Sequence, residues 1–408
     1  MLNWAKQFNI FCLLDNHQYH FSEPPFECLL AAGSMARLQP SPGHAFTALQ
    51  EFAASQNDWI FGHLCYDLKN EIEELSSQNF DGTGFPDLFF FVPETIVILK
   101  KDSLQIGIIE GDATLIHKRI LEAIADTGQI NPVPDLQSRF SKQEYMATVE
   151  RLRQHILRGD CYEINFCQEF YAEDVAVNPL EMYEQLSRIS PNPFAAFYRL
   201  NDKYLLCSSP ERYLKKEGAT IFSQPIKGTA RRDLGDAKND EQNKVKLSVS
   251  KKEIAENVMV VDLVRNDLSK VCIDGSVKVD ELFGLYTFPQ VHQMISTVSG
   301  TLDDKVHLSD ILKATFPMGS MTGVPKKSVM QLIEKYERTK RGLFSGAVGY
   351  IQPGGDFDFN VVIRSILYNA TQKYISIQAG SAITFYSDAA TEYEECLLKI
   401  EAIKKVLG

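Results

Sequence analysis

Short apolar runs separated by turn-forming residues dominate the first part of the chain. One run covers Asp58 to Leu64, and others cover 88–92, 95–99 and 104–109. Runs of this length, bounded by polar or turn residues, are typical of β-strands. We expect 88–92 and 95–99 to pair as a hairpin around Pro93-Glu94, because strands with short connections are usually antiparallel neighbours.

The same pattern returns in the second half. Residues 194–200 and 203–207 flank an Asn201-Asp202 turn, and 347–352 and 359–368 flank Pro353-Gly354-Gly355-Asp356. A further apolar run, 374–379, follows closely. Connections this short predict antiparallel sheets, since parallel strands need longer crossovers.

Apolar residues with helical spacing lie between the strands. Ser141 and Glu144 form the signature of a capping box, and the apolar residues that follow predict a helix up to Gly159. Further helices are predicted at 117–125, 253–268, 308–315, 326–336 and 389–406. The predicted fold class is α+β, with large antiparallel β-sheets packed together and helices on their outer faces.

A segment with two prolines, 128–135, divides the sequence. We expect an N-terminal region at 1–135 and a second region at 136–408. A chain of 408 residues has material for two or three domains or for one large unit.

The amino-acid composition limits the kinds of molecule that the protein can bind and the cellular compartment in which we expect it. The formal net charge of −11 argues against a nucleic-acid surface, which needs clustered Lys and Arg. The eight cysteines include no CxxC pair, so we expect reduced thiols rather than a zinc site or a disulfide framework. The sequence shows no signal-peptide pattern and no apolar run long enough to span a bilayer, so we expect a cytoplasmic protein without membrane contact.

The stretch from Ser223 to Thr229 is the first candidate for chemistry. Pro225 restricts the backbone and Gly228 permits a tight turn, with Lys227 between them. Burial can lower the pKa of a lysine amine and make it a nucleophile at neutral pH. The alternative is a solvated surface lysine, which is the usual state of this residue.

Two pairs of glutamates have helical spacing. Glu253 and Glu256 lie three residues apart on one predicted helix, and Glu392 and Glu395 repeat the spacing on the last one. Four carboxylates from two helices could hold Mg²⁺, which prefers oxygen ligands. Alternatively, Glu253 completes a capping box with Ser250, and the C-terminal pair is solvated.

The remaining candidates for chemistry are single residues and one turn that lie far apart in the sequence. Glu211 follows a predicted strand and could act as a general acid or pair with Arg212. Arg364 lies in an apolar strand and would need an anionic partner there. The turn from Gly319 to Lys326 could bind an anion at a helix start, although it lacks the P-loop spacing. The histidines form neither HExxH nor an evident triad.

Together these stretches resemble the chorismate-utilising enzymes, which include anthranilate synthase large subunits, isochorismate and salicylate synthases, and aminodeoxychorismate synthase component I. The resemblance covers roughly two-thirds of the chain, from Phe140 to Leu407. Its blocks, in chain order, are Gly159-Asp160-Cys161-Tyr162, Ser208-Ser209-Pro210-Glu211-Arg212, Pro225-Ile226-Lys227-Gly228-Thr229, Lys252-Glu253-Ile254-Ala255-Glu256-Asn257, Val261-Asp262-Leu263-Val264-Arg265-Asn266-Asp267, the turn 319–326, Gly346-Ala347-Val348-Gly349-Tyr350, Ile363-Arg364, Gln378-Ala379-Gly380 and 392–399. So many blocks in one order are more specific than any single motif.

The resemblance implies the fold of these enzymes, and Lys227 indicates one branch. The matching motif carries alanine in anthranilate synthases, whereas in aminodeoxychorismate synthases it carries a lysine that is the nucleophile. This branch converts chorismate and ammonia to 4-amino-4-deoxychorismate for p-aminobenzoate and folate, and a glutamine amidotransferase subunit supplies the ammonia.

The resemblance also implies residue roles. Lys227 would attack chorismate and Glu211 would protonate the leaving hydroxyl. Mg²⁺ would be held through Glu256 and Glu395, with Glu253 and Glu392 close by or acting through water. The remaining roles concern substrate binding: Arg364, Tyr350 and Lys399 would hold carboxylates, and Gly228, Thr229, Thr322 and Gly380 would shape the pocket.

Three positions depart from the family pattern. Glu163 stands where the isomerase members carry a lysine base, which argues against isochorismate or salicylate formation. Gln293 stands where anthranilate synthases have histidine, with His292 one place earlier, and Ala382 replaces a frequent glycine. The sequence leaves the roles of Glu163, His292 and Gln293 open. The alternatives to the aminodeoxychorismate branch are anthranilate synthase component I, a lyase of tryptophan biosynthesis, and a non-catalytic chorismate-binding subunit.

Overall fold

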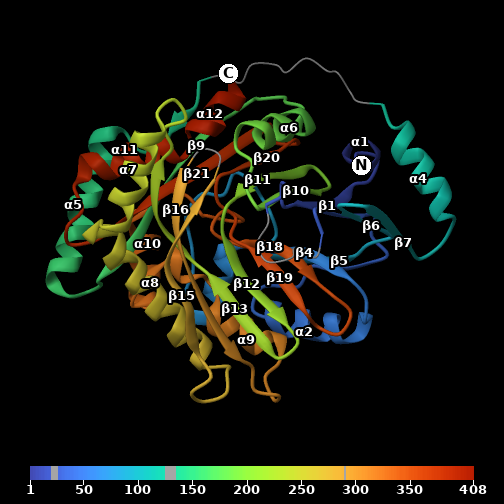
Figure 1. Cartoon of the computed structure of the whole chain (residues 1–408), viewed down its shortest axis with the longest axis horizontal. Helices are drawn as coiled ribbons and strands as arrows, with labels where there is room; N and C mark the ends of the chain where they lie inside the picture. The colour runs from blue at the N-terminus through green and yellow to red at the C-terminus, as the bar shows by residue number, and fades with distance from the viewer. Residues whose placement is uncertain (20–25, 125–134, 289–290) are drawn as a thin grey trace.

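Two antiparallel β-sheets organise the protein (Figure 1). The computed structural model describes residues 1–19, 26–124, 135–288 and 291–408. Within these ranges the first sheet has eleven strands, in spatial order β17 (Gly323–Val324), β9 (Glu163–Ala172), β21 (Tyr374–Ile383), β20 (Ser365–Asn369), β11 (Lys203–Ser209), β10 (Phe194–Leu200), β1 (Ile10–Asp15), β2 (Cys28–Ala32), β6 (Thr95–Lys100) and β7 (Ser103–Ile108), with β8 (Gln137–Ser138) beside β9.

The second sheet has ten strands within the same ranges. In spatial order they are β14 (Ile226–Arg231), β16 (Val291–Thr301), β13 (Thr220–Gln224), β12 (Arg212–Glu217), β19 (Phe357–Asn360), β18 (Ala347–Ile351), β4 (Ile60–Leu64), β5 (Leu88–Val92) and β3 (Ala36–Leu38), with β15 (Lys278–Thr287) beside β16.

Helices lie around the two sheets, with α5 and α11 on one side of the view and α4 on the other (Figure 1). They are α1 (Leu2–Ala5), α2 (Ala45–Gln56), α3 (Lys69–Glu73), α4 (Ala113–Glu122), α5 (Lys142–Arg158), α6 (Pro179–Ile189), α7 (Ala237–Ser248), α8 (Lys251–Ser269), α9 (Leu308–Thr315), α10 (Lys326–Tyr336), α11 (Ala389–Lys399) and α12 (Glu401–Leu407), with short 3₁₀ turns at Tyr66–Leu68 and Gly319–Met321. None of the helices described is both long and apolar enough to cross a membrane.

The central strands of the first sheet are buried on both faces, whereas β7 at its edge has exposed residues. Along β1, Ile10 and Cys12 join an apolar core that also contains Phe61 and Phe91 of the second sheet. Phe11 and Leu13 instead join a core with residues of α5, α6, α11 and α12. Successive side chains of a strand point to opposite faces, so one apolar strand contributes to both cores.

The predicted α+β class with antiparallel sheets is confirmed. The helices at 308–315 and 326–336 have the predicted bounds. Ser141 and Glu144 make both bonds of the capping box, and Gly159 ends α5 with a left-handed φ of 84°. The helix predicted at 117–125 begins earlier, at Ala113, and residue 125 lies outside the described residues.

The predicted hairpin at 88–99 is wrong. β5 pairs with β3 and β4 in the second sheet, while β6 pairs with β2 and β7 in the first. The chain therefore crosses from one sheet to the other at Pro93-Glu94. A short connection can join stacked sheets as well as neighbouring strands, and the spacing of apolar residues does not distinguish the two.

The strand predicted at 359–368 is also divided between the sheets. β19 ends at Asn360 in the second sheet and β20 begins at Ser365 in the first. Arg364 lies in the crossing with a left-handed φ of 50°. A non-glycine residue rarely adopts this conformation, and such strain often marks a functional site. The last predicted helix is likewise interrupted, at Ile400, between α11 and α12.

Strands from both sides of residue 135 share both sheets. β1 pairs with β10 in the first sheet, and β4 pairs with β18 in the second. The predicted boundary segment 128–135 lies outside the described residues except for Asp135. The division into 1–135 and 136–408 stays a prediction, and the two regions are joined by continuous hydrogen-bonded sheets.

Candidate active site

A cavity of about 580 Å³ brings together most of the residues that the sequence singled out. This volume is in the range that holds small organic ligands. The predicted residues that line it are Glu211, Lys227, Gly228, Thr229, Glu253, Glu256, Arg364, Gly380, Glu395 and Lys399. They come from both sheets and from α8 and α11, so this grouping exists only in the folded chain.

Lys227 is buried on β14, with 8% of its surface exposed. Its Nζ donates a hydrogen bond to Oε1 of Glu163 at 2.7 Å. Burial alone would lower the pKa of Lys227, but the negative charges of Glu163 and Glu256 outweigh it and raise the pKa above its usual value. The alternative of a solvated lysine is therefore wrong, and the buried amine is held as an ammonium ion rather than as a free amine.

Glu211 lies next to β12 and is also buried, with 3% exposed. Burial raises the pKa of Glu211 to about 7, against the opposing positive charges of Lys227 and Arg364. A carboxyl group with this pKa can donate a proton near neutral pH. The alternative pairing with Arg212 is not formed, since the Arg212 guanidinium binds Asp358 through Nε at 2.9 Å and Nη2 at 3.1 Å.

Three of the four predicted glutamates, from α8 and α11, converge on the ammonium group of Lys252. Its Nζ lies 3.0 Å from Glu392 Oε1, 3.6 Å from Glu395 Oε2 and 3.8 Å from Glu256 Oε1. Ser250 caps α8 by accepting from the Glu253 backbone N–H, while the Glu253 side chain lines the cavity. Glu392 is buried, with 1% exposed, and does not line the cavity. Glu392 and Glu395 are therefore part of this cluster. The alternative interpretation, that they are simply solvated, is wrong.

The chemistry of this cluster fits a divalent cation. Glu256 Oε1 and Glu392 Oε2 are buried without a hydrogen-bond partner, and burial raises the pKa of Glu256 to about 8. For Glu395, burial is outweighed by the nearby ammonium groups of Lys399 and Lys252, which hold its pKa at about 2. In the described parts of the chain, no three Asp, Glu, His or Cys side chains stand already arranged around a metal position. The side chains here surround an ammonium ion instead.

Cationic groups complete the cavity wall. Burial lowers the pKa of Arg364 to about 10, and the Glu211 carboxyl group opposes this shift. Lys399 Nζ donates to the backbone carbonyl of Gly380 and to Glu395 Oε1, both at 2.8 Å. These two cations could bind the carboxylates of an anionic substrate.

Two glycines are required by the close packing of this wall. A Cβ at Gly380 would lie 2.1 Å from the backbone oxygen of Phe166. Gly228 has a φ of 97°, and a Cβ there would lie 3.1 Å from Glu253 Oε2. Both positions therefore exclude larger residues.

The structure places Tyr350 and Thr322 away from this cavity, which corrects the expectation that they contact substrate there. Val348 and Tyr350 share one face of β18 and line a different cavity. The Thr322 hydroxyl donates within its own turn, to the carbonyls of Met318 and Gly319. Sequence motifs locate a segment near a site, but the alternation of side chains along a strand decides which residue faces it.

Several residues of the site were not assigned a role from sequence. Phe344 lines the cavity from the turn before β18, and Lys252 lies one turn before Glu256 on the same face of α8, a spacing that could have indicated it. Gln293 lines the cavity with its buried Oε1 unpartnered, whereas His292 bonds Thr287 and Asp240, both at 3.0 Å. Ala382 also lines the cavity.

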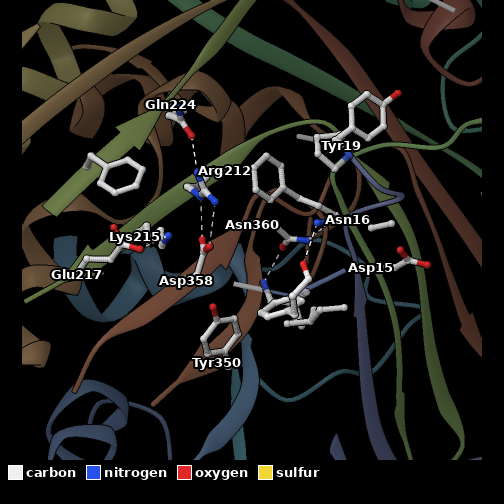
Figure 2. A pocket seen from close by; sticks show the side chains of 17 residues that line it. Asp15, Asn16, Tyr19, Arg212, Lys215, Glu217, Gln224, Tyr350, Asp358 and Asn360 are labelled. Atoms are coloured by element: carbon white, nitrogen blue, oxygen red, sulfur yellow. Dashed lines mark hydrogen bonds and ion pairs between the residues drawn. The ribbon is translucent and has the colours of Figure 1, made fainter. Parts of the chain in front are cut away.

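The second cavity, which has a volume of about 170 Å³, lies between β1, β12 and β18 (Figure 2). Arg212 extends between Gln224 and Asp358 on one side, and Asp15 and Tyr19 lie on the other (Figure 2). It contains none of the candidate nucleophiles or acids described above.

The fold and the site define a class of enzyme. Residues 13–405 match the family of chorismate binding enzymes, and the chain belongs to this family. It is 35% identical to aminodeoxychorismate synthase component 1 of Salmonella typhimurium, over 84% of this chain and 75% of that protein. It is 33% identical to the protein of the same name from Escherichia coli, over 85% of this chain and 76% of that protein.

A solved structure agrees with this assignment. The crystal structure of anthranilate synthase component I from Streptococcus pneumoniae superposes with a TM-score of 0.78 at 26% identity. The superposition covers 95% of this chain and 94% of that one. The predicted resemblance to the chorismate-utilising enzymes, in fold and in family, is confirmed.

Proposed function

We propose that this protein is the chorismate-aminating component of an aminodeoxychorismate synthase, which converts chorismate and ammonia to 4-amino-4-deoxychorismate. One observation carries the proposal: a buried lysine, Lys227, shares the cavity with Glu211, a carboxyl group whose pKa of about 7 suits a general acid. The names of the relatives from Salmonella typhimurium and Escherichia coli give independent support.

The proposed reaction proceeds through a covalent intermediate. The Lys227 amine attacks C2 of chorismate while the C4 hydroxyl leaves as water, with its proton taken from Glu211. Ammonia then attacks C4 and displaces the lysine from C2. A covalent intermediate divides one difficult displacement into two easier ones. Arg364 and Lys399 supply positive charge for the substrate carboxylates.

Magnesium is part of this proposal. Glu256 and Glu395 would hold the ion, with Glu253 and Glu392 beside them or acting through water, and the unpartnered oxygens of Glu256 and Glu392 support this assignment. When bound, Mg²⁺ would neutralise the ring carboxylate of chorismate.

The ammonia would come from a glutamine amidotransferase partner, in agreement with the "component 1" in the relatives' names. The proposed compartment is the cytoplasm, because all eight cysteines are buried free thiols, as expected where disulfides do not persist.

Intact-mass analysis after incubation with chorismate and Mg²⁺, without ammonia, tests the covalent route. We expect a chorismate-derived adduct that maps to Lys227 and is absent from Lys227→Ala. Turnover without any adduct at Lys227 would contradict the covalent route while leaving the activity in place.

Product analysis with chorismate and ammonium tests the activity itself. We expect 4-amino-4-deoxychorismate, with the pyruvyl group retained. Anthranilate formed without an added lyase would identify an anthranilate synthase instead, and the absence of any turnover would indicate a non-catalytic chorismate-binding subunit.

A further inference from the structure

Glu163 is the carboxylate in direct contact with the proposed nucleophile. It is the first residue of β9, where it lies opposite Val324 of β17, and 1% of its surface is exposed. Its Oε1 accepts the hydrogen bond from Lys227 Nζ at 2.7 Å. Its other oxygen, Oε2, is buried without a hydrogen-bond partner. A buried carboxylate with one unused oxygen can take up a proton without breaking another contact.

Lys227 needs such a partner because an ammonium ion has no lone pair with which to attack carbon. The charged groups that face Lys227 come from four elements: Glu163 on β9, Glu253 and Glu256 on α8, Glu211 beside β12, and Glu395 and Lys399 on α11. Among the hydrogen bonds of the described residues, Lys227 Nζ donates to Glu163. Glu211 must keep its own proton for the leaving hydroxyl, and Glu253, Glu256 and Glu395 belong to the proposed magnesium cluster.

We propose that Glu163 is the base that removes the proton from Lys227 and later returns it. This inference rests on the proposed function. First, the Lys227 ammonium gives one proton to Glu163 and becomes a neutral amine. The amine then forms its bond to C2 as the C4–O bond breaks, and Glu211 supplies the proton that turns the leaving hydroxyl into water.

The second half of the cycle restores the pair. Ammonia forms a bond to C4, the C2–N bond of the secondary ammonium breaks, and Lys227 leaves as a neutral amine. The new ammonium group at C4 gives one proton to Glu211, which had given its own to the leaving hydroxyl. Glu163 then returns the proton, so that the ammonium–carboxylate pair is present again before the next turnover. Both proton transfers between Lys227 and Glu163 occur across one existing hydrogen bond.

Glu163→Gln is the sharpest test, because the amide has nearly the same shape and can still accept a hydrogen bond from Lys227, but cannot take a proton. The rate of adduct formation at Lys227 is measured by rapid quench and intact mass, in a single turnover with chorismate and Mg²⁺. At pH 7.5 we expect a fall of about 100-fold or more, the usual contribution of a general base. The ratio of wild-type to variant rates should shrink as pH rises, because solvent then removes the proton. Glu211 is present in both proteins, so the pH dependence that it causes is the same in both rates and cancels in this ratio.

Two further variants separate proton transfer from simple positioning. Glu163→Asp keeps a carboxylate and should restore most of the lost rate. Glu169→Gln removes another buried carboxylate of β9, which bonds Arg139 and Ser376, and should leave adduct formation unchanged. Circular dichroism and thermal melting of each variant confirm that it is folded.

The possible outcomes distinguish a failure of the inference about Glu163 from a failure of the proposed function. If the wild type makes 4-amino-4-deoxychorismate and labels Lys227, but Glu163→Gln labels at the same rate at every pH, Glu163 is not the base and the function stands. Equal slowing of the Gln and Asp variants at every pH would likewise overturn the inference. If the wild type makes no 4-amino-4-deoxychorismate, the proposed function itself fails.

Discussion

At the residue scale, the same cavity raises the pKa of both Lys227 and Glu211, but for different reasons. Burial disfavours the charged form of both groups. For Lys227 the neighbouring carboxylates outweigh burial, so the amine stays charged until its proton is removed. For Glu211 burial is the larger effect and raises its pKa to about 7. The nucleophile thus needs a base, while the acid already carries its proton near neutral pH.

This difference predicts the pH dependence of turnover. Glu211 acts in its protonated form, which dominates below its pKa of about 7, so kcat/KM should fall as pH rises above that value. Glu211→Gln should remove this limb of the profile and lower kcat about 100-fold or more, since the amide has no acidic proton to give. The measurement is a pH profile of kcat/KM for both proteins. A wild-type profile without a break between about pH 6 and 8 would contradict the assignment.

At the element scale, α8 and α11 act as a pair. Each helix carries two glutamates one turn apart, and Glu256 of α8 and Glu392 and Glu395 of α11 approach one position, which the Lys252 ammonium occupies. Neither helix alone has enough ligands for a hard divalent ion. The proposed magnesium site therefore depends on the contact between two helices that lie far apart in the sequence.

Magnesium should stabilise the wild-type protein by binding this helix pair. At a Mg²⁺ concentration one hundred times the dissociation constant, the gain in unfolding free energy is about 2.7 kcal/mol. Thermal unfolding with MgCl₂, against NaCl of equal ionic strength, should show a higher midpoint that Glu256→Gln loses. Glu394→Gln is the matched control, because exposed Glu394 of α11 pairs with Lys142 instead. No shift in the wild type, with or without chorismate, would contradict the site.

At the scale of the whole molecule, the two regions of the chain are joined by shared sheets. Removing residues 1–135 would take β1 away from β10 and β4 away from β18, and would open the core between the sheets. Newly exposed strand edges and apolar faces promote aggregation.

A chain beginning at residue 136 should therefore be insoluble or unfolded when it is produced alone. Solubility, circular dichroism and turnover with chorismate and ammonium are the measurements, with the full chain as the control. A soluble, cooperatively folding 136–408 fragment would show that the predicted regions are independent domains.

Much of the local structure follows from local sequence. The helix from Ser141 to Gly159 depends on its caps and on apolar spacing, and the hairpin at Asn201-Asp202 depends on its turn residues. The residues around Lys227, Glu211 and the glutamate pairs were identified from motifs, and the cavity brings most of them together. The sequence could not show that strands 88–92 and 95–99 belong to different sheets, or that Tyr350 and Lys227 line different cavities, because both depend on how the sheets stack.

The sequence by itself determined the α+β class, the family and the set of reactive groups, because these depend on residue types and on their order along the chain. The tertiary structure decided the state of those groups. It buried Lys227, placed Glu163 against it although 64 positions separate them, and raised the pKa of Glu211. Charge and proton affinity depend on burial and on neighbours in space, and only the folded chain supplies these.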